Sequence, residues 1–162
     1  MSDKIIPSPE EERAFGKALG AFATGVAVVT TVSEIGHAGI TANSFSSVSL
    51  DPALVLWAVA KGSKRHDAFA DGGAFTIHIM ARDQDSIATG FAHDAQAFEG
   101  IDYSENPEGV RVISGCLSAF ECQTQAVHDA GDHTIIVGQV LRFSQNDGEA
   151  LLFSQGKYGR FI

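Results

Sequence analysis

The stretch GITANSFSSVSLDP, residues 39–52, concentrates small polar side chains between two apolar segments. Its hydroxyl groups belong to Thr41, Ser44, Ser46, Ser47 and Ser49, and Asn43 lies among them. A strand inside a hydrophobic core carries apolar side chains at most inward positions, so these hydroxyls need another explanation. Two interpretations are open: an edge strand that faces solvent, or one wall of a polar ligand site. Composition alone favours the edge strand.

Short apolar segments separated by turns surround this stretch. Strands are predicted at residues 25–32, 53–60, 74–80, 116–127, 133–144 and 149–154. Their β-branched residues and alternating patterns are typical of strands, and the 17 glycines are typical of a chain with many turns. The order of elements lacks regular alternation of strand and helix. It therefore predicts a mainly β protein, an antiparallel barrel with helices at its ends.

Three helices are predicted around these strands. The first is long and is ended by Thr24-Gly25. At its start Ser8 is the expected N-cap, Pro9 fits the first helical position and Glu11 completes a capping box. Two short helices are expected over residues 63–70 and 83–92, and residues 93–111 are expected to be the least regular part of the chain.

The length and composition indicate the class of protein. The 162 residues are expected to form a single domain over 1–162, with its core at about 15–160. No apolar run approaches the roughly 20 residues that a membrane helix needs, so no membrane association is expected. The acidic N-terminal segment lacks the apolar core of a secretory signal, which predicts a cytoplasmic protein.

The balance of charge excludes one class of partner. Lys and Arg number 11 and Asp and Glu number 20, which gives a net charge of −9. An acidic surface repels the phosphate backbone, so no nucleic acid is expected as a partner. The two cysteines, Cys116 and Cys122, are expected to be buried thiols on one face of a strand rather than a disulfide framework.

A local cluster of positive charge follows the strand at 53–60. Ser63 is predicted to begin a short helix, and Lys64, Arg65 and His66 come directly after it. Unpaired backbone N–H groups, the helix dipole and two cations together predict a phosphate site. The alternative is a solvated basic patch.

The segment HDAGDH, residues 128–133, holds two histidines and two aspartates. Its spacing matches no familiar metal site, so a metal is not expected, and a loop that presents His133 beside a pocket is favoured. The chain also has no G-x-S-x-G, P-loop or G-x-G-x-x-G motif. A nucleotide cofactor would therefore bind here without a Rossmann fold.

Together these segments resemble a known family. The sequences FATGVAVVTT, GITANSFSSVSLDPALVL, SKRHDAFADGGAFTIHIM, FA at 91–92, GDHTIIVGQV and GKY occur in the order and spacing of the short-chain flavin reductases. These proteins are the reductase components of two-component flavin-dependent monooxygenases. The resemblance extends from about Phe15 to Tyr158, and TANSFSSVSLDP followed by GDH is its most specific pair of motifs.

The resemblance implies a fold and an activity. It implies a split β-barrel of Greek-key type with flavin sites near the interface of a homodimer. It also implies an NAD(P)H:flavin oxidoreductase that transfers hydride from NADH or NADPH to flavin N5 of FMN or FAD. Diffusible reduced flavin then reaches a partner monooxygenase.

The resemblance also implies site residues. The motif around the hydroxyl run assigns flavin contacts to Thr41, Ala42, Asn43, Ser44, Ser46 and Ser47. The second segment assigns phosphate contacts to Ser63, Lys64 and Arg65, although Arg65 and His66 stand where the family commonly has a small hydroxyl residue. Flavin contacts are further expected from Phe91, Ala92 and Tyr158, and nicotinamide positioning, without acid–base chemistry, from His133.

Three alternatives stay open at this point. A split-barrel oxidase of the pyridoxamine-phosphate oxidase kind would hold FMN tightly and oxidise a small amine. A non-catalytic flavin or haem binder on the same barrel would show no NADH turnover. A metal-dependent hydrolase built on His128 and His133 has the least support.

Overall fold

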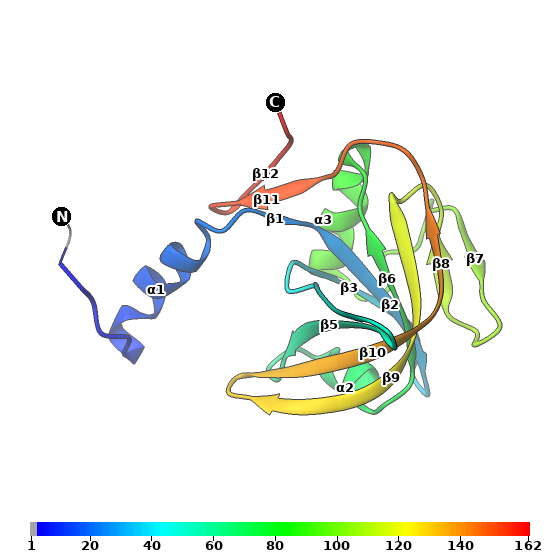
Figure 1. Cartoon of the computed structure of the whole chain (residues 1–162), viewed down its shortest axis with the longest axis horizontal. Coiled ribbons are helices and arrows are strands. Elements are labelled where there is room, and N and C mark those ends of the chain that lie inside the picture. Colours follow the sequence, from blue (N-terminus) through cyan, green and yellow to red (C-terminus); the bar gives the residue numbers. More distant parts are fainter. Residues whose placement is uncertain (1–2) are drawn as a thin grey trace.

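A computed structural model describes residues 3–162 of the chain (Figure 1). Its main sheet contains seven antiparallel strands in the order β3-β2-β6-β9-β10-β5-β4. Their bounds are β2 Ala27–Ser33, β3 Gly36–Ala42, β4 Ser46–Leu50, β5 Ala53–Ala60, β6 Ala74–Ile79, β9 Ser118–Ala130 and β10 His133–Gln145. The sheet curls into a barrel that leaves β3 and β4 as its edges. β3 also contacts β5, and we call the region where these two strands approach each other the seam.

Smaller elements accompany this barrel. One small sheet has the order β1-β11-β12, with bounds Thr24–Gly25, Leu152–Ser154 and Lys157–Gly159. A second sheet pairs β7 (Tyr103–Glu105) with β8 (Arg111–Ile113). The helices are η1 Pro9–Glu11, α1 Glu12–Leu19, α2 His66–Ala70, η2 Arg82–Gln84 and α3 Asp85–His93. None of the helices in residues 3–162 is long and apolar enough to cross a membrane.

Two apolar clusters hold the fold together. Inside the barrel, the fully buried Trp57 packs edge-to-face on Phe69 at 5.0 Å between ring centroids and also contacts Phe75. Outside the barrel, Phe91 of α3 packs on Phe98 at 4.8 Å. Burying such aromatic side chains contributes about 2–3 kcal/mol each. Val29, Val59 and Ile136, from strands predicted by their β-branched residues, are buried in the same cluster as Trp57.

The segment HDAGD is not the predicted loop. β9 continues through His128 to Ala130, and only Gly131 and Asp132 connect it to β10. Gly131 has φ = +69°, a conformation that glycine adopts without a steric penalty. His128 pairs with Ile135, whereas His133 pairs with Ala130, so the two histidines sit at different levels of the hairpin. No group of three or more metal-ligating side chains is found in the described part of the chain.

Several predicted helix boundaries were wrong. The first helix ends at Leu19 and does not continue to Thr24-Gly25. The Ser8 side chain makes no capping hydrogen bond, so the predicted capping box is absent from the described residues. The second begins at His66 rather than at Ser63. Cys116 precedes β9 and does not share a strand with Cys122, although both thiols are buried and free as predicted.

The N-terminal segment stands away from the barrel (Figure 1). α1 has no buried residue, and Phe15, Leu19 and Phe22 expose 49%, 59% and 80% of their surface. Exposed apolar side chains of this kind stabilise a protein only when another part of the chain or a partner molecule buries them.

Candidate functional site

A cavity of about 370 Å³ opens at the seam of the barrel. Its lining comes from β3, the turn after β5, the end of α3 and the small sheet: Val26, Ile40, Thr41, Ala42, Asn43, Ser63, Arg65, Ala92, Phe153 and Tyr158. The volume lies within the range of pockets for small molecules, roughly 300–1,000 Å³. We call this cavity the seam pocket.

Segments far apart in the sequence meet in the seam pocket. The predicted site residues that line it are Thr41, Ala42, Asn43, Ser63, Arg65, Ala92 and Tyr158. The predicted residues outside its lining are Ser44, Ser46, Ser47, Lys64, Phe91 and His133. Ser46 and Ser47 are exposed on β4, and Lys64 is exposed in the turn after β5. Their contacts with a ligand stay predictions.

Two hydroxyls of the opening stretch are already engaged with the backbone. Thr41 Oγ1 donates to the Ala88 carbonyl of α3 at 2.6 Å. Ser44 Oγ accepts from the Ala58 N–H at 2.9 Å and donates to the Ala58 carbonyl at 3.1 Å. The Ala58 groups lie beyond the last residue of β5 that pairs with β4, so Ser44 continues the ladder where the strand stops. Both hydroxyls therefore serve the fold, and of the two residues only Thr41 lines the pocket.

The segment from Ser63 to His66 is a tight turn followed by a short helix. Ser63 Oγ accepts from the Arg65 N–H at 3.2 Å, and the His66 N–H donates to the Ser63 carbonyl at 3.1 Å. α2 contains only five residues, so its dipole is weak. An anion here would be held by cations and turn N–H groups rather than by a helix terminus.

Among the described residues that line the seam pocket, Arg65 is the only one with a cationic side chain. Burial lowers the pKa of its guanidinium, and the charge of Asp94 partly opposes that shift. An arginine stays protonated at physiological pH even so. The pocket therefore holds a fixed positive charge that complements a phosphate.

His133 lies at the start of β10, beside the turn that follows β5. It pairs with Ala60, and the Lys61 N–H donates to the Asp132 carbonyl at 2.9 Å. The His133 Nδ1 donates to Asp132 Oδ1 at 2.8 Å, which lowers the pKa of the Asp132 carboxyl. The Nδ1 atom is thus engaged, and the His133 side chain is 46% exposed.

Phe91 occupies a different place from the one expected. Its side chain is fully buried beneath β3, while its neighbour Ala92 faces the seam pocket. A Cβ at Gly39 would lie 2.6 Å from the Phe91 ring, so only glycine allows this close approach of α3 to β3. Phe91 therefore positions the helix that carries Ala92, and any contact with a ligand would come from its backbone.

Sequence reasoning missed three apolar residues of the lining, Val26, Ile40 and Phe153. Val26 belongs to the segment 25–32, which was interpreted as a buried strand, and Ile40 belongs to the opening stretch, where only the polar residues were assigned to the site. Phe153 packs edge-to-face on Tyr158 at 5.7 Å, which turns the two rings into one apolar wall. The G-x-Y motif was a signal for Tyr158, but no signal in the sequence marks Phe153.

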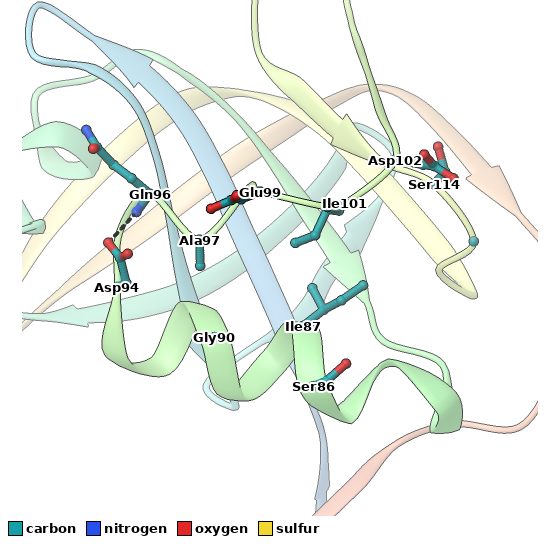
Figure 2. Close-up of a pocket in the computed structure, with 12 residues that line it drawn as sticks. Ser86, Ile87, Gly90, Asp94, Gln96, Ala97, Glu99, Ile101, Asp102 and Ser114 are labelled. Atoms are coloured by element: carbon teal, nitrogen blue, oxygen red, sulfur yellow. Dashed lines mark hydrogen bonds between the residues drawn. The ribbon is translucent and has the colours of Figure 1, made fainter.

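A larger hollow of about 700 Å³ lies elsewhere, between α3 and the segment 94–102 (Figure 2). Its lining includes Asp94, Glu99 and Asp102, and none of its residues carries a positive charge. Figure 2 shows Asp94 at the end of α3, where it accepts a hydrogen bond from the Gln96 N–H at 2.9 Å. Three carboxylates would repel a phosphate, so this hollow suits the predicted ligand less than the seam pocket does.

The seam pocket has the chemistry that a flavin requires. Apolar rings and Ile40 offer a face for stacking, Asn43 offers a side-chain amide at the rim, and Arg65 offers a cation for phosphate. The fold and the lining of the pocket fit a flavin-binding antiparallel barrel.

Comparisons with known proteins agree with this class. Residues 19–161 match the family described as the flavin reductase like domain. FMN reductase (NADH) SmoA from Agrobacterium fabrum is 53% identical over 157 residues, which is 97% of this chain and 90% of that protein. The reductase subunit HsaB of a flavin-dependent monooxygenase from Rhodococcus jostii is 35% identical, over 91% of this chain and 77% of that protein.

A solved structure shows the same architecture. The NADH:FAD oxidoreductase SgcE6 from Streptomyces globisporus superposes with a TM-score of 0.90 at 32% identity, over 100% of this chain and 94% of that one. The chain belongs to the flavin reductase like family. The predicted split barrel and the predicted class of enzyme, a flavin reductase, are confirmed.

Proposed function

We propose that this chain uses NADH to reduce FMN bound in the seam pocket, and that it also accepts FAD. The observation that carries the proposal is the convergence of residues 41–43, Ser63, Arg65, Ala92 and Tyr158 on one cavity. The 53% identity to a protein named FMN reductase (NADH) supports the choice of flavin and of hydride donor. When bound, the two cofactors supply the redox chemistry, in which a hydride passes from NADH to the flavin.

The protein's own part in this reaction is orientation. Phe153 and Tyr158 form one apolar wall for the ring system, and the Thr41–Asn43 backbone runs along its edge. Arg65 neutralises the phosphate. The lining of the described pocket contains no carboxylate and no imidazole, which suits a hydride transfer that needs no general base.

His133 is proposed to position the nicotinamide from the rim. Its ring is hydrogen-bonded through Nδ1, which leaves Nε2 for a substrate, and its side chain is about half exposed, at 46%. The role assigned to it is binding rather than proton transfer.

A homodimer and a separate oxygenase are proposed as partners. The exposed Phe15, Leu19 and Phe22 on the N-terminal segment would be covered by a second copy of the chain. The relative named as a monooxygenase reductase subunit supports transfer of diffusible reduced flavin to an oxygenase. The two free, buried cysteines suit a reducing cytoplasm.

The test is NADH oxidation by the purified protein with free FMN or FAD, followed by the absorbance of NADH. Catalytic loss of NADH that depends on added flavin is expected, with FMN giving the higher kcat/KM. Absence of turnover, with a tightly bound yellow cofactor, would favour the amine oxidase or the non-catalytic binder instead. NADPH as the better donor would refute the proposed nicotinamide preference alone.

A further inference from the structure

The seam leaves backbone groups without strand partners. β3 is an edge of the seven-stranded sheet, so one side of its backbone has no ladder. Gly39 faces that side: its N–H donates to the Ala95 carbonyl at 2.8 Å, and its carbonyl accepts from Arg65 Nη1 at 3.1 Å. Arg65 therefore occupies the place of a missing strand at this level of β3.

The same nitrogen serves the end of α3. Arg65 Nη1 also donates to the carbonyl of Phe91, which lies in the last turn of the helix. Carbonyls of the last turn lack an intrahelical donor, and a cation near them is favourable because of the helix dipole. One guanidinium nitrogen thus joins β3, α3 and the turn after β5.

The segment that carries Arg65 is itself anchored on the far side of the seam. His66 Nδ1 donates to Asp67 Oδ1 at 2.8 Å, and this bond leaves Nε2 as an acceptor for the Thr134 hydroxyl at 2.7 Å. Thr134 is buried in β10, directly after His133. The turn cannot move toward or away from the pocket without breaking one of these contacts.

We propose that Arg65 is a positioning residue: its guanidinium links β3 to α3 across the seam and so sets the shape of the flavin pocket, in addition to supplying charge. We call this pair of hydrogen bonds, to the carbonyls of Gly39 and Phe91, the clasp. The inference rests on the proposed function, since the seam pocket is taken as the flavin site. A small hydroxyl residue at this position could not reach from the β5–α2 turn to both carbonyls. In this chain the clasp acts on every flavin, whether or not the flavin carries a phosphate.

Riboflavin, which lacks the phosphate, separates the clasp from a simple phosphate contact. The experiment measures the Kd of FMN and of riboflavin by flavin fluorescence, for the wild type, Arg65→Met and Arg65→Lys. Loss of two charge-assisted hydrogen bonds is expected to raise the Kd of riboflavin about tenfold. The Kd of FMN should rise by at least that factor, because FMN also loses the phosphate contact. Lysine should restore little, because a single ammonium lacks the planar fork. A rise for FMN with riboflavin unchanged, or no rise for either, would overturn the clasp.

A second readout needs no flavin. Amide hydrogen exchange in Arg65→Met should accelerate over residues 38–42 and 90–95, while residues 118–124 of β9 keep the wild-type rate. Unchanged exchange at both sites would also overturn the clasp. Arg82→Met is the matched control: it removes an exposed arginine that pairs with Glu149 outside the pocket, and should alter neither readout. Failure of the proposed function would instead appear as absent NADH oxidation in the wild type.

Discussion

The strands β2 and β6 have partners on both of their edges, and we call this part of the barrel its closed side. There the imidazole of His78, on β6, is fully buried, and its two nitrogens are hydrogen-bonded to backbone groups. Nδ1 donates to the Val28 carbonyl at 2.8 Å, and Nε2 accepts from the Ile113 N–H at 2.9 Å. At the seam, Asn43 is exposed at the rim of a cavity. Among the described residues, the side-chain hydrogen bonds of Arg65 are made by Nη1 alone. On the closed side, the polar atoms of His78 form hydrogen bonds within the fold. At the seam, the Asn43 amide and the other guanidinium nitrogens of Arg65 are available to a ligand.

The closed side predicts a pH effect on stability, which is the largest effect expected here. Burial lowers the pKa of His78 from 6.5 to about 4. Because the unfolded chain binds this proton at higher pH than the folded chain, acidification from about pH 6.5 to about pH 4 favours unfolding. The contribution of this group to the free energy of unfolding should fall by about 3 kcal/mol over that range.

Denaturant unfolding of the wild type and His78→Gln over this range measures that contribution. Glutamine removes the titrating group, so the difference in stability between the two proteins should shrink as the pH falls. A difference that stays constant between about pH 6.5 and pH 4 would contradict the assignment of a neutral, buried imidazole.

The seam predicts an effect on binding and not on folding. Ala92 is exposed and lines the seam pocket, so Ala92→Phe should fill the cavity and leave the fold intact. A clash of about 2 kcal/mol raises the Kd of FMN about thirtyfold. Ser86→Phe is the matched control, because Ser86 is also exposed on α3 but lines the larger acidic hollow of Figure 2. If only the Ser86 variant bound FMN more weakly, the flavin site would have to be assigned to that hollow instead.

The rim of the seam predicts a smaller, kinetic effect. His133→Ala should raise the KM for NADH about tenfold, because the variant loses one hydrogen bond to a charged or strongly polar group of the nucleotide. The Kd of FMN should change little, because His133 lies outside the pocket lining. Steady-state kinetics with NADH varied at saturating FMN separates the two, and an unchanged KM would remove His133 from the nicotinamide site.

The wall of the seam predicts the smallest effect. Thr41→Val removes the hydrogen bond from Oγ1 to the Ala88 carbonyl while keeping the shape of the side chain. The free energy of unfolding should fall by about 1 kcal/mol. Val29→Ala, a truncation inside the barrel core, should cost more than this, which denaturant titration of both variants would show. If Thr41→Val lowered the free energy of unfolding as much as Val29→Ala or more, the Thr41 hydroxyl would contribute more to stability than one hydrogen bond.

The sequence was most informative where the side-chain pattern is local. The apolar segments predicted the strands β2, β5, β6 and β10 within a few residues, because burial on a barrel requires such patterns. The end of β9 was missed, since His128, Asp129 and Ala130 are polar or small and are held in the strand by pairing with β10. Long-range pairing of this kind leaves no signal in the local pattern.

The same limit applies to the site. Motifs in family order located Thr41, Asn43, Ser63 and Tyr158, which the structure brings to one cavity. No motif distinguishes a hydroxyl that faces a ligand from one such as Ser44, which completes the hydrogen bonding of β5. The clasp of Arg65 was equally hidden, because Gly39 and Phe91 are each 26 residues away from it in the sequence.

Amide hydrogen exchange of the wild type with and without saturating FMN tests the central claim most directly. The seam pocket predicts slower exchange on binding at residues 39–43, 63–66 and 91–93, with residues 96–102 of the acidic hollow unchanged. Slower exchange confined to residues 96–102 would contradict the assignment of flavin binding to the seam.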